Sequence, residues 1–583
     1  MRKLLALFLA ALIFVPATAM AAASVEDLQL QIKQLKEDLD YLSERLDKPE
    51  RHAALDRIMF SGDLRAKADT LHYKDVTFNP GILVDFNDFG AKAMDPTNAA
   101  GFNTQLTDAN GVPLLDGNGN PVTPLSKLMA ANPGLATAFA NGQLSGVMPY
   151  AFPGGFQDDI NNDIVYTTRL RLNMKAKVSD NVNFSGRLTM YKNWGDSTGV
   201  KVFDSWDSYT QDGTDGGNTT GDWLRVERAF MDWKDIGGSN FYFSVGRRPS
   251  TYGPPSQYRE NEMRGGTPSG HLVHFNFDGI TIGYHLSELT GIEGQTVRFC
   301  YGQGYESQWG NGELFNQVDL DDTHLGGFNV DFLNDGTNFL QFTLFRAIDV
   351  ADGFKGLIAF PTEYARYFAP TLYQDMQKFP NFNFVTRVQP STNIGDITLG
   401  GVGFTRQEDN GINWFGSFGW TQTDPNGKAG MFGGLLSDAI YEAQLNEEGT
   451  DIIMSPARPT NDDKHDGFSV YAGVQIPAPY GKVGFEYNWG SKYWTPFTQA
   501  QDDMLGSKLA TRGHVGEAYY IFDVNPNMFI KVGGMYYDYQ YSGSGSPVGE
   551  PHKIDDIQDG KAFSMLPVVD KAWDGYASLT VKF

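Results

Sequence analysis

The last ten residues, DGYASLTVKF (574–583), decide the fold because they alternate between apolar and polar side chains and end on an aromatic residue. Successive side chains of an extended strand point to opposite faces, so this strand has one apolar face and one polar face. The apolar face comprises Trp573, Gly575, Ala577, Leu579, Val581 and Phe583, and the polar face comprises Asp574, Tyr576, Ser578, Thr580 and Lys582. A soluble sandwich would bury the apolar face in its core, whereas a transmembrane barrel would turn it towards lipid.

The same alternation recurs from Ile58 onward, beginning in RIMFSGDLRAKAD (57–69). The polar face of DIVYTTRLRLNMKAKVSD (163–180) carries four cations, Arg169, Arg171, Lys175 and Lys177. Four cations are too many for the buried side of a soluble protein, so we expect this face to meet water. Further apolar faces lie within 182–190, 412–420, 468–474, 483–489 and 528–536. In HFNFDGITIGYHLS (274–287) the apolar face changes side at Asp278, which predicts a β-bulge.

The connections between these strands alternate in length. Long gaps fall at about 70 to 163, 193 to 222, 249 to 270, 304 to 321, 349 to 393, 424 to 465, 491 to 510 and 542 to 571. Short turns lie between them: VSDN, DIGGS, TGIEGQ, LNDG, EDNG, IPAPYG and DVNPN. Eight long loops interleaved with seven short turns give sixteen strands with both ends on the short-turn side. The predicted fold class is therefore all-β, a transmembrane antiparallel β-barrel of about 16 strands whose last strand pairs with the first near Ile58.

The N-terminal region predicts two segments before the barrel. Residues 1–21 show Arg2 and Lys3, an apolar run too short to span a membrane, and small residues, as a secretory signal peptide does. Residues 22–49 place apolar side chains at a and d heptad positions up to Pro49, which predicts a periplasmic coiled-coil helix. A lone amphipathic helix is the alternative for this segment. The barrel is expected over 57–583.

Composition excludes several classes of function. A formal net charge of −24 argues against a nucleic-acid partner. The one cysteine, Cys300, cannot form an intramolecular disulfide, and the chain has no paired cysteines for zinc or iron–sulfur. DGNGN (116–120) and DGTDGGNTTGD (212–222) have calcium-like oxygen spacings, but neither continues to the glutamate of a calcium-binding hand. We predict no cofactor, no metal site and no catalytic group, with loop-bound calcium as the alternative.

The signal peptide, heptad helix, sixteen-strand pattern and terminal Phe583 together resemble the trimeric bacterial outer-membrane porins. FSVGRRPSTYGPPSQYRENE (243–262) resembles the strand and third loop of the phosphate-selective porin group and of a related uncharacterised porin-like family. The resemblance implies a homotrimer in the outer membrane of a Gram-negative-type bacterium, with a third loop that folds inward and narrows the barrel. The lysine-rich arrays of phosphate channels are not evident, so phosphate specificity is not carried over.

This resemblance and the polar strand faces give the candidate site residues. The expected pore-constriction residues are Arg247, Arg248, Arg259, Glu260, Glu262 and Arg264, and the expected pore-lining residues are Arg65, Lys67, Arg169, Arg171, Lys175 and Lys177. An ordinary solvated loop is the alternative for the first set. Cations outnumber glutamates in these sets, which predicts a modest preference for anions.

The predicted function is passive diffusion of small hydrophilic solutes or ions through a water-filled barrel that contacts outer-membrane lipid. One alternative is a structural or adhesion protein that uses the coiled coil or the long loops. A barrel enzyme is a further alternative, but no convincing pair of catalytic residues supports it.

Overall fold

A computed structural model describes residues 58–583 except 80, 86–88, 90, 92–103, 109, 132–136, 138–146, 152–155, 196–220, 251, 263–265, 309–319, 353–355, 361–383, 389, 446–451 and 499–501. The chain divides into two compact units, residues 1–59 and 60–583. The predicted signal peptide (1–21) and coiled-coil helix (22–49) lie outside the described residues.

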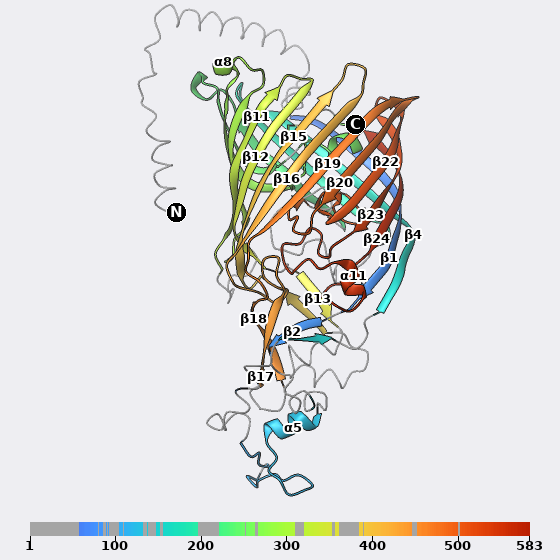
Figure 1. Ribbon diagram of the computed structural model, residues 1–583. Helices are drawn as coiled ribbons and strands as arrows, with labels where there is room; N and C mark the ends of the chain where they lie inside the picture. Colours follow the sequence, from blue (N-terminus) through green and yellow to red (C-terminus); the bar gives the residue numbers. More distant parts are fainter. Residues whose placement is uncertain are drawn as a thin grey trace, which may run out of the picture. The chain divides into compact units, whose positions relative to one another are not determined.

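Sixteen strands close into one antiparallel barrel (Figure 1), which confirms the predicted all-β fold class. The strands are β1 (Ile58–Phe78), β4 (Phe156–Lys177), β5 (Val182–Asn193), β6 (Gly221–Trp233), β7 (Phe241–Pro249), β9 (Asn276–His285), β10 (Thr296–Tyr305), β11 (Thr323–Asn334), β12 (Asn338–Ala351), β15 (Asn393–Gln407), β16 (Asn413–Pro425), β19 (His465–Ala478), β20 (Gly481–Gly490), β22 (Gly513–Asn525), β23 (Met528–Tyr539) and β24 (Lys571–Lys582). The last strand pairs with the first, in a register that runs from Asp63 opposite Lys582 to Lys74 opposite Lys571. This pairing removes the free edge that an open sheet would expose.

The connections are sorted by length as predicted. We number the long ones in chain order: loop 1 (79–155), loop 2 (194–220), loop 3 (250–275), loop 4 (306–322), loop 5 (352–392), loop 6 (426–464), loop 7 (491–512) and loop 8 (540–570). Even the shortest of these, loop 4, is longer than the longest short connection, 286–295. Loop 1 is shorter than the predicted gap because β1 and β4 continue at its base, where Lys74 and Asp159 form an ion pair.

Several loops carry small elements of their own. Loops 1 and 6 together form a four-stranded sheet in the order β18 (Ile452–Pro459), β17 (Ala439–Leu445), β2 (Gly81–Asp85), β3 (Val147–Ala151), and loop 5 contains the pair β13 (Gly356–Phe360) and β14 (Phe384–Val388). Short helices are α5 (Pro124–Ala131), η3 (Ile236–Gly238), α7 (Ser256–Arg259), α8 (Ser287–Thr290), η4 (Lys508–Ala510) and α11 (Ile554–Gln558). No helix in the described part of the chain is both long and apolar enough to cross a membrane.

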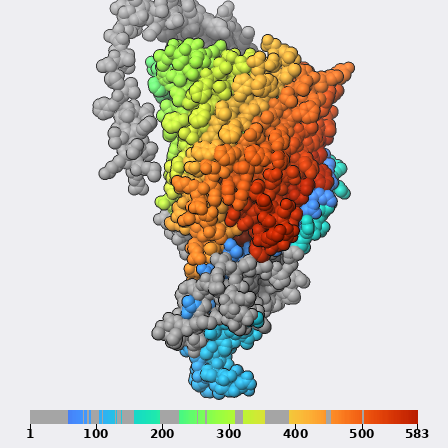
Figure 2. Space-filling view, in the orientation of Figure 1, coloured from blue at the N-terminus to red at the C-terminus, as the bar shows by residue number. Residues whose placement is uncertain are grey.

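The two faces of the barrel strands differ as the alternation predicts. Large apolar side chains remain exposed on the outer face, among them Phe60, Leu64, Phe328, Phe342, Phe418, Val470, Phe485, Val532 and Leu579. Figure 2 shows this outer face as a continuous surface from β11 to β23. On β24 the polar residues Asp574, Tyr576, Ser578 and Thr580 are buried inside the barrel. The alternation therefore separates side chains on the outer face from side chains in the barrel interior, as in a transmembrane barrel.

The predicted bulge at Asp278 is wrong. β9 pairs with β7 without a shift of register from Tyr284 to Asn276, and Phe277 points into the barrel interior. A shift of register occurs instead between β5 and β6, after Arg187 and its partner Arg228. The prediction failed because the sequence pattern was read with every apolar side chain facing lipid, whereas Phe277 faces the barrel interior.

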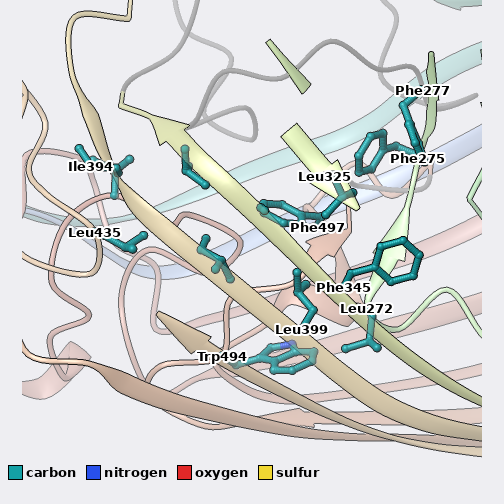
Figure 3. Packing of buried hydrophobic residues seen from close by; sticks show 14 of the residues in the cluster. Leu272, Phe275, Phe277, Leu325, Phe345, Ile394, Leu399, Leu435, Trp494 and Phe497 are labelled. Atoms are coloured by element: carbon teal, nitrogen blue, oxygen red, sulfur yellow. The ribbon is translucent and has the colours of Figure 1, made fainter. Parts of the chain in front are cut away.

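Loops 3 and 7 pack inside the barrel and give it a hydrophobic core (Figure 3). Leu272 and Phe275 of loop 3 and Trp494 and Phe497 of loop 7 pack against inward side chains of the wall such as Phe345 and Leu399. The two loops also pair with each other through two short parallel strands, β8 (Val273–His274) and β21 (Phe497–Thr498). Much of the interior is therefore filled with protein.

Candidate functional site

Loop 3 reverses tightly and places α7 inside the barrel. A Cβ atom on Gly253 would lie 2.1 Å from the carbonyl oxygen of Thr267, so only glycine fits where the two arms of the loop meet. The N–H of Gly270 donates to the carbonyl oxygen of Pro254 at 2.7 Å and holds the reversal. As a result Tyr258, Arg259 and Glu260 are all buried.

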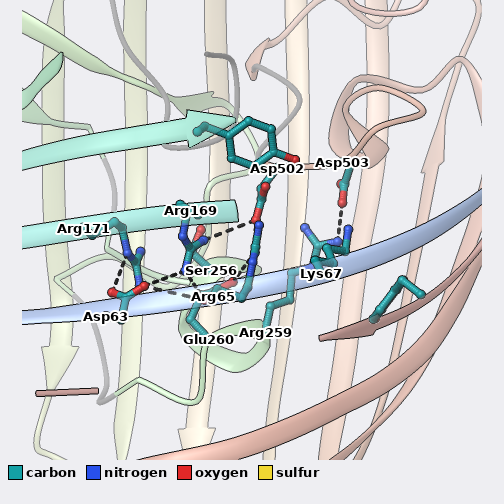
Figure 4. A network of polar contacts seen from close by, with 12 residues as sticks. Asp63, Arg65, Lys67, Arg169, Arg171, Ser256, Arg259, Glu260, Asp502 and Asp503 are labelled. Carbon is teal, nitrogen blue, oxygen red and sulfur yellow. Dashed lines mark hydrogen bonds and ion pairs between the residues drawn. The ribbon is translucent and has the colours of Figure 1, made fainter. Parts of the chain in front are cut away.

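Glu260 lies at the centre of a group of ion pairs, which we call the seam cluster: Asp63, Arg65, Arg169, Arg171, Glu260, Glu262 and Asp502. Figure 4 shows this cluster with all of its members labelled except Glu262. Its carboxylate accepts from Arg169 at 2.5 Å and lies 3.4 Å from Arg65. Both arginines also pair with Asp502 of loop 7, Arg169 at 3.2 Å. The seam cluster therefore ties loops 3 and 7 to strands β1 and β4.

Asp63 completes the cluster on the wall side. It accepts from Arg171 Nε at 2.7 Å and lies 3.1 Å from Arg169, so it bridges β1 and β4. The side chains of Arg65 and Arg169 are only 4% and 3% exposed. Buried charges are retained only when paired, and removing one partner of a buried pair costs about 3–5 kcal/mol. The expectation that this face meets water is thus wrong at Arg169 and Arg171, because the inward loops cover them.

A second group of charges fixes the other side of α7. Arg259 pairs with Asp503 of loop 7 and lies 3.4 Å from Glu517 of β22. Lys508 of loop 7 joins Glu517 to Glu486 of β20, the latter at 2.5 Å. Loop 3 is therefore held between two walls of the barrel by charges of both signs.

Two adjoining cavities remain beside loop 3, of about 60 and 230 Å³. Both have Ser250 and Tyr252 in their walls, and together they follow the inner wall from β4 to β16. Seven arginines line them, Arg169, Arg171, Arg187, Arg228, Arg248, Arg259 and Arg298, against four carboxylates, Glu227, Glu260, Glu262 and Asp502. The walls of these two cavities therefore carry more arginines than carboxylates. Three further acids, Asp63, Asp331 and Asp503, do not line the cavities but pair with arginines that do.

Not all predicted site residues come together. Arg65, Arg169, Arg171, Arg259, Glu260 and Glu262 lie in or beside the seam cluster, and Lys67 pairs with Asp69 at 2.5 Å. Lys175 and Lys177 are exposed near the short turn after β4. Arg264 lies outside the described residues. The structure also separates Arg248, which lines the larger cavity, from Arg247, which pairs with the exposed Asp278 at 2.6 Å.

Arg247 shares a side of β7 with the exposed Phe241 and Val245, so its guanidinium lies on the outer face of the barrel. Its expected role in the constriction does not fit this placement.

Sequence reasoning missed Arg187, Arg228 and Arg298, which point inward from β5, β6 and β10. Arg187 and Arg298 could have been found, because each alternates with outward apolar neighbours in its strand. Arg228 could not, because the shift of register beside it makes Glu227 and Arg228 both face the interior. The buried Cys300 packs beside Thr281, whose hydroxyl oxygen lies 3.2 Å from the cysteine sulfur.

One group of described residues brings potential metal ligands together, Asp438, Glu550 and His552, within 4.8 Å of one another. His552 Nε2 lies 2.7 Å from Asp438, and Lys492 lies 3.1 Å from Glu550, so both carboxylates already have partners. Burial lowers the pKa of His552, but its hydrogen bond to Asp438 and the charge of that carboxylate outweigh burial and raise the pKa above its ordinary value. We therefore describe the group as an ion-paired contact between loops 6 and 8.

These features define a closed sixteen-strand β-barrel with an apolar outer face and an inward loop held by charges. The chain belongs to the family DUF3373, described as a protein of unknown function, whose model matches residues 159–583. No curated protein matches the sequence.

Solved structures similar to this chain include OprB of Pseudomonas putida, with 10% identity and a TM-score of 0.38, covering 91% of this chain and 96% of that one. An anion-selective porin from Comamonas acidovorans has 9% identity and a TM-score of 0.38, covering 90% and 99%. OmpF of Salmonella typhi, in complex with daunomycin, has 11% identity and a TM-score of 0.35, covering 90% and 97%.

Proposed function

We propose that the protein is an outer-membrane porin that lets small hydrophilic solutes or ions diffuse passively along the cavities beside loop 3. The observation that carries the proposal is the combination of an exposed apolar outer face with an arginine-lined space inside a closed barrel. A lipid-facing exterior and a polar interior are what a channel across an outer membrane requires.

The charges around the cavities support a preference for anions. Seven arginines and four carboxylates line the two cavities, and among the described residues Arg248 alone of the seven has no carboxylate within 4 Å, although the whole chain has a formal net charge of −24. Lining charges select ions by sign, and dissolved salt screens them, with a Debye length of about 3 Å at 1 M. The preference should therefore be modest, clear at low salt and weak near 1 M. In this proposal Arg248, Arg259, Glu260 and Glu262 form the constriction.

The remaining expectations complete the proposal. Residues 1–21 are a signal peptide, residues 22–49 a periplasmic coiled coil that supports a homotrimer, and residues 57–583 the barrel in the outer membrane of a Gram-negative-type bacterium. The proposed activity is transport without catalysis or a cofactor.

A structural or adhesion role is the second candidate, and the filling of the interior by loops 3 and 7 favours it. Single-channel recording of the purified protein in a planar bilayer tests the two. A porin gives discrete conductance steps, with a reversal potential on the anion side in a salt gradient at low concentration. Inserted protein that gives no conductance steps would exclude the porin and leave the structural role.

A further inference from the structure

Arg248 differs from the other arginines that line the two cavities. Each of the others lies within 4 Å of a carboxylate: Arg169 and Arg171 of Asp63, Arg187 and Arg228 of Glu227, Arg259 of Asp503, and Arg298 of Asp331. Among the residues that the structure describes, Arg248 has no such partner. It donates to the hydroxyl of Thr281, and its buried Nε has no hydrogen-bond partner.

The larger cavity, of about 230 Å³, is where Arg248 lies. No carboxylate lines it among the described residues, and Arg298, its other cation, is neutralised by Asp331. The wall carries neutral hydroxyl and amide groups instead, from Ser250, Thr281, Asn329, Gln341, Thr343 and Ser417, together with apolar side chains such as Leu272, Phe277, Leu325 and Phe345. The cavity thus has one uncompensated positive charge among neutral side chains, of which part can form hydrogen bonds.

Its size limits what it can hold. A cavity needs a volume of about 10–15 Å³ to hold a single water molecule, and pockets that bind drug-sized ligands start at about 300 Å³. The cavity therefore has room for one small solute and too little for a large one.

We propose that this cavity binds a small hydroxylated monocarboxylate, whose carboxylate pairs with Arg248. A guanidinium matches a carboxylate geometrically and forms charge-assisted hydrogen bonds with it. One uncompensated charge favours a single negative charge over the higher charge of phosphate. The hydroxyl and amide side chains of the wall offer donors and acceptors to hydroxyl groups of the solute. The inference deepens the proposed porin function, which would supply the route of entry.

Equilibrium binding in detergent tests the inference without a membrane. Gluconate serves as the probe, with glucose, which lacks the carboxylate, and inorganic phosphate as comparisons. We expect the wild-type barrel to bind gluconate measurably by titration calorimetry, and to bind phosphate more weakly and glucose not at all. In Arg248→Gln, gluconate affinity should fall about tenfold or more, because a charge-assisted contact is lost.

Arg247→Gln is the matched control, because it removes the same charge one residue away on the outer face. It should bind gluconate as the wild type does. Equal affinity of gluconate and glucose for the wild type, equal affinity of gluconate and phosphate, or undiminished gluconate affinity in Arg248→Gln would overturn the inference. The wild-type comparison of the three solutes holds even if a variant fails to fold. Conductance without gluconate binding would refute this site alone, whereas gluconate binding without conductance would refute the porin function alone.

Discussion

Replacing Glu260 by Gln should loosen loop 3 inside the barrel. The change keeps the size of the side chain but removes the charge that pairs with Arg169 at 2.5 Å and with Arg65 at 3.4 Å. Breaking a buried ion pair costs about 3–5 kcal/mol when the remaining charge is stranded. Here the three arginines of the seam cluster still have three acidic partners, Asp63, Glu262 and Asp502. We therefore expect the free energy that holds loop 3 in place to fall by about 3 kcal/mol, near the lower end of this range.

This loss of stabilisation should shift the equilibrium of loop 3 towards an open state without releasing the loop completely. Other contacts remain, because Lys582 Nζ donates to the carbonyl oxygens of residues 260 and 261 at 2.9 and 2.8 Å, and Arg259 keeps Asp503. Each 1.4 kcal/mol is a factor of ten, so the open population of loop 3 rises by roughly 100-fold. We expect higher and noisier single-channel conductance and faster tryptic cleavage after Arg259, which is buried in the wild type.

Glu262→Gln is the control, since the same substitution is made two residues away at a side chain that is 36% exposed and pairs with Arg171 alone among the seam arginines. An exposed pair contributes about 0–1 kcal/mol, so the rate of cleavage after Arg259 should change little. If both variants changed the cleavage rate equally, or neither did, the seam cluster would not be what holds loop 3.

Three other predictions follow from the closing strand, the N-terminal heptads and the loop 6 contact. Deleting LTVKF (579–583) removes the β24 partners of Asp63 to Ala66, so the protein should be exported but fail to insert, and normal outer-membrane levels would contradict this. Native mass measurement in detergent should give a trimer that Leu35→Asp weakens, because an unpaired buried charge is costly; a monomeric wild type would refute it. Because the pKa of His552 is raised in the fold, its contact with Asp438 stabilises most below the unfolded value near 6.5 and is lost as pH rises through the folded value. The melting temperature of wild type relative to His552→Gln should therefore be higher at about pH 5 than at about pH 8.5, and a constant difference would contradict it.

The sequence predicted the barrel because its signals are local. Alternation along each strand and the lengths of the connections are both read within a few residues, and both correspond directly to pleat and topology. The residues of β24 illustrate this, since every polar position from Asp574 to Thr580 faces the interior. No knowledge of distant contacts was needed for this part of the fold.

The interior could not be read in the same way, because it depends on contacts across hundreds of residues. Arg65 meets Asp502 and Arg259 meets Asp503, and nothing near either arginine in the sequence indicates an acidic partner in loop 7. The inward course of loop 7 has no local signal either, because Trp494 and Leu509 are as typical of an outer surface in lipid as of a core. The sequence thus predicted which side chains face inward more reliably than what they meet there.

The pair Arg247 and Arg248 shows why a count of charges along the sequence is a poor guide to the charge of a pore. The two residues are identical and adjacent, yet the pleat turns one to the outer face beside Asp278 and the other to the cavity beside Thr281. The two residues before Gly246 show which arginine faces outward, because Val245 is exposed, Ser244 is buried and the alternation continues through Gly246. Arg247 therefore lies on the same side as Val245, and Arg248 lies on the same side as Ser244. The same reasoning explains how a chain with a formal net charge of −24 can have an arginine-lined cavity. Among the described residues, the uncompensated charge of the larger cavity is set by a single inward position, Arg248. Selectivity in this barrel should therefore respond to Arg248 far more than to the many exposed acids.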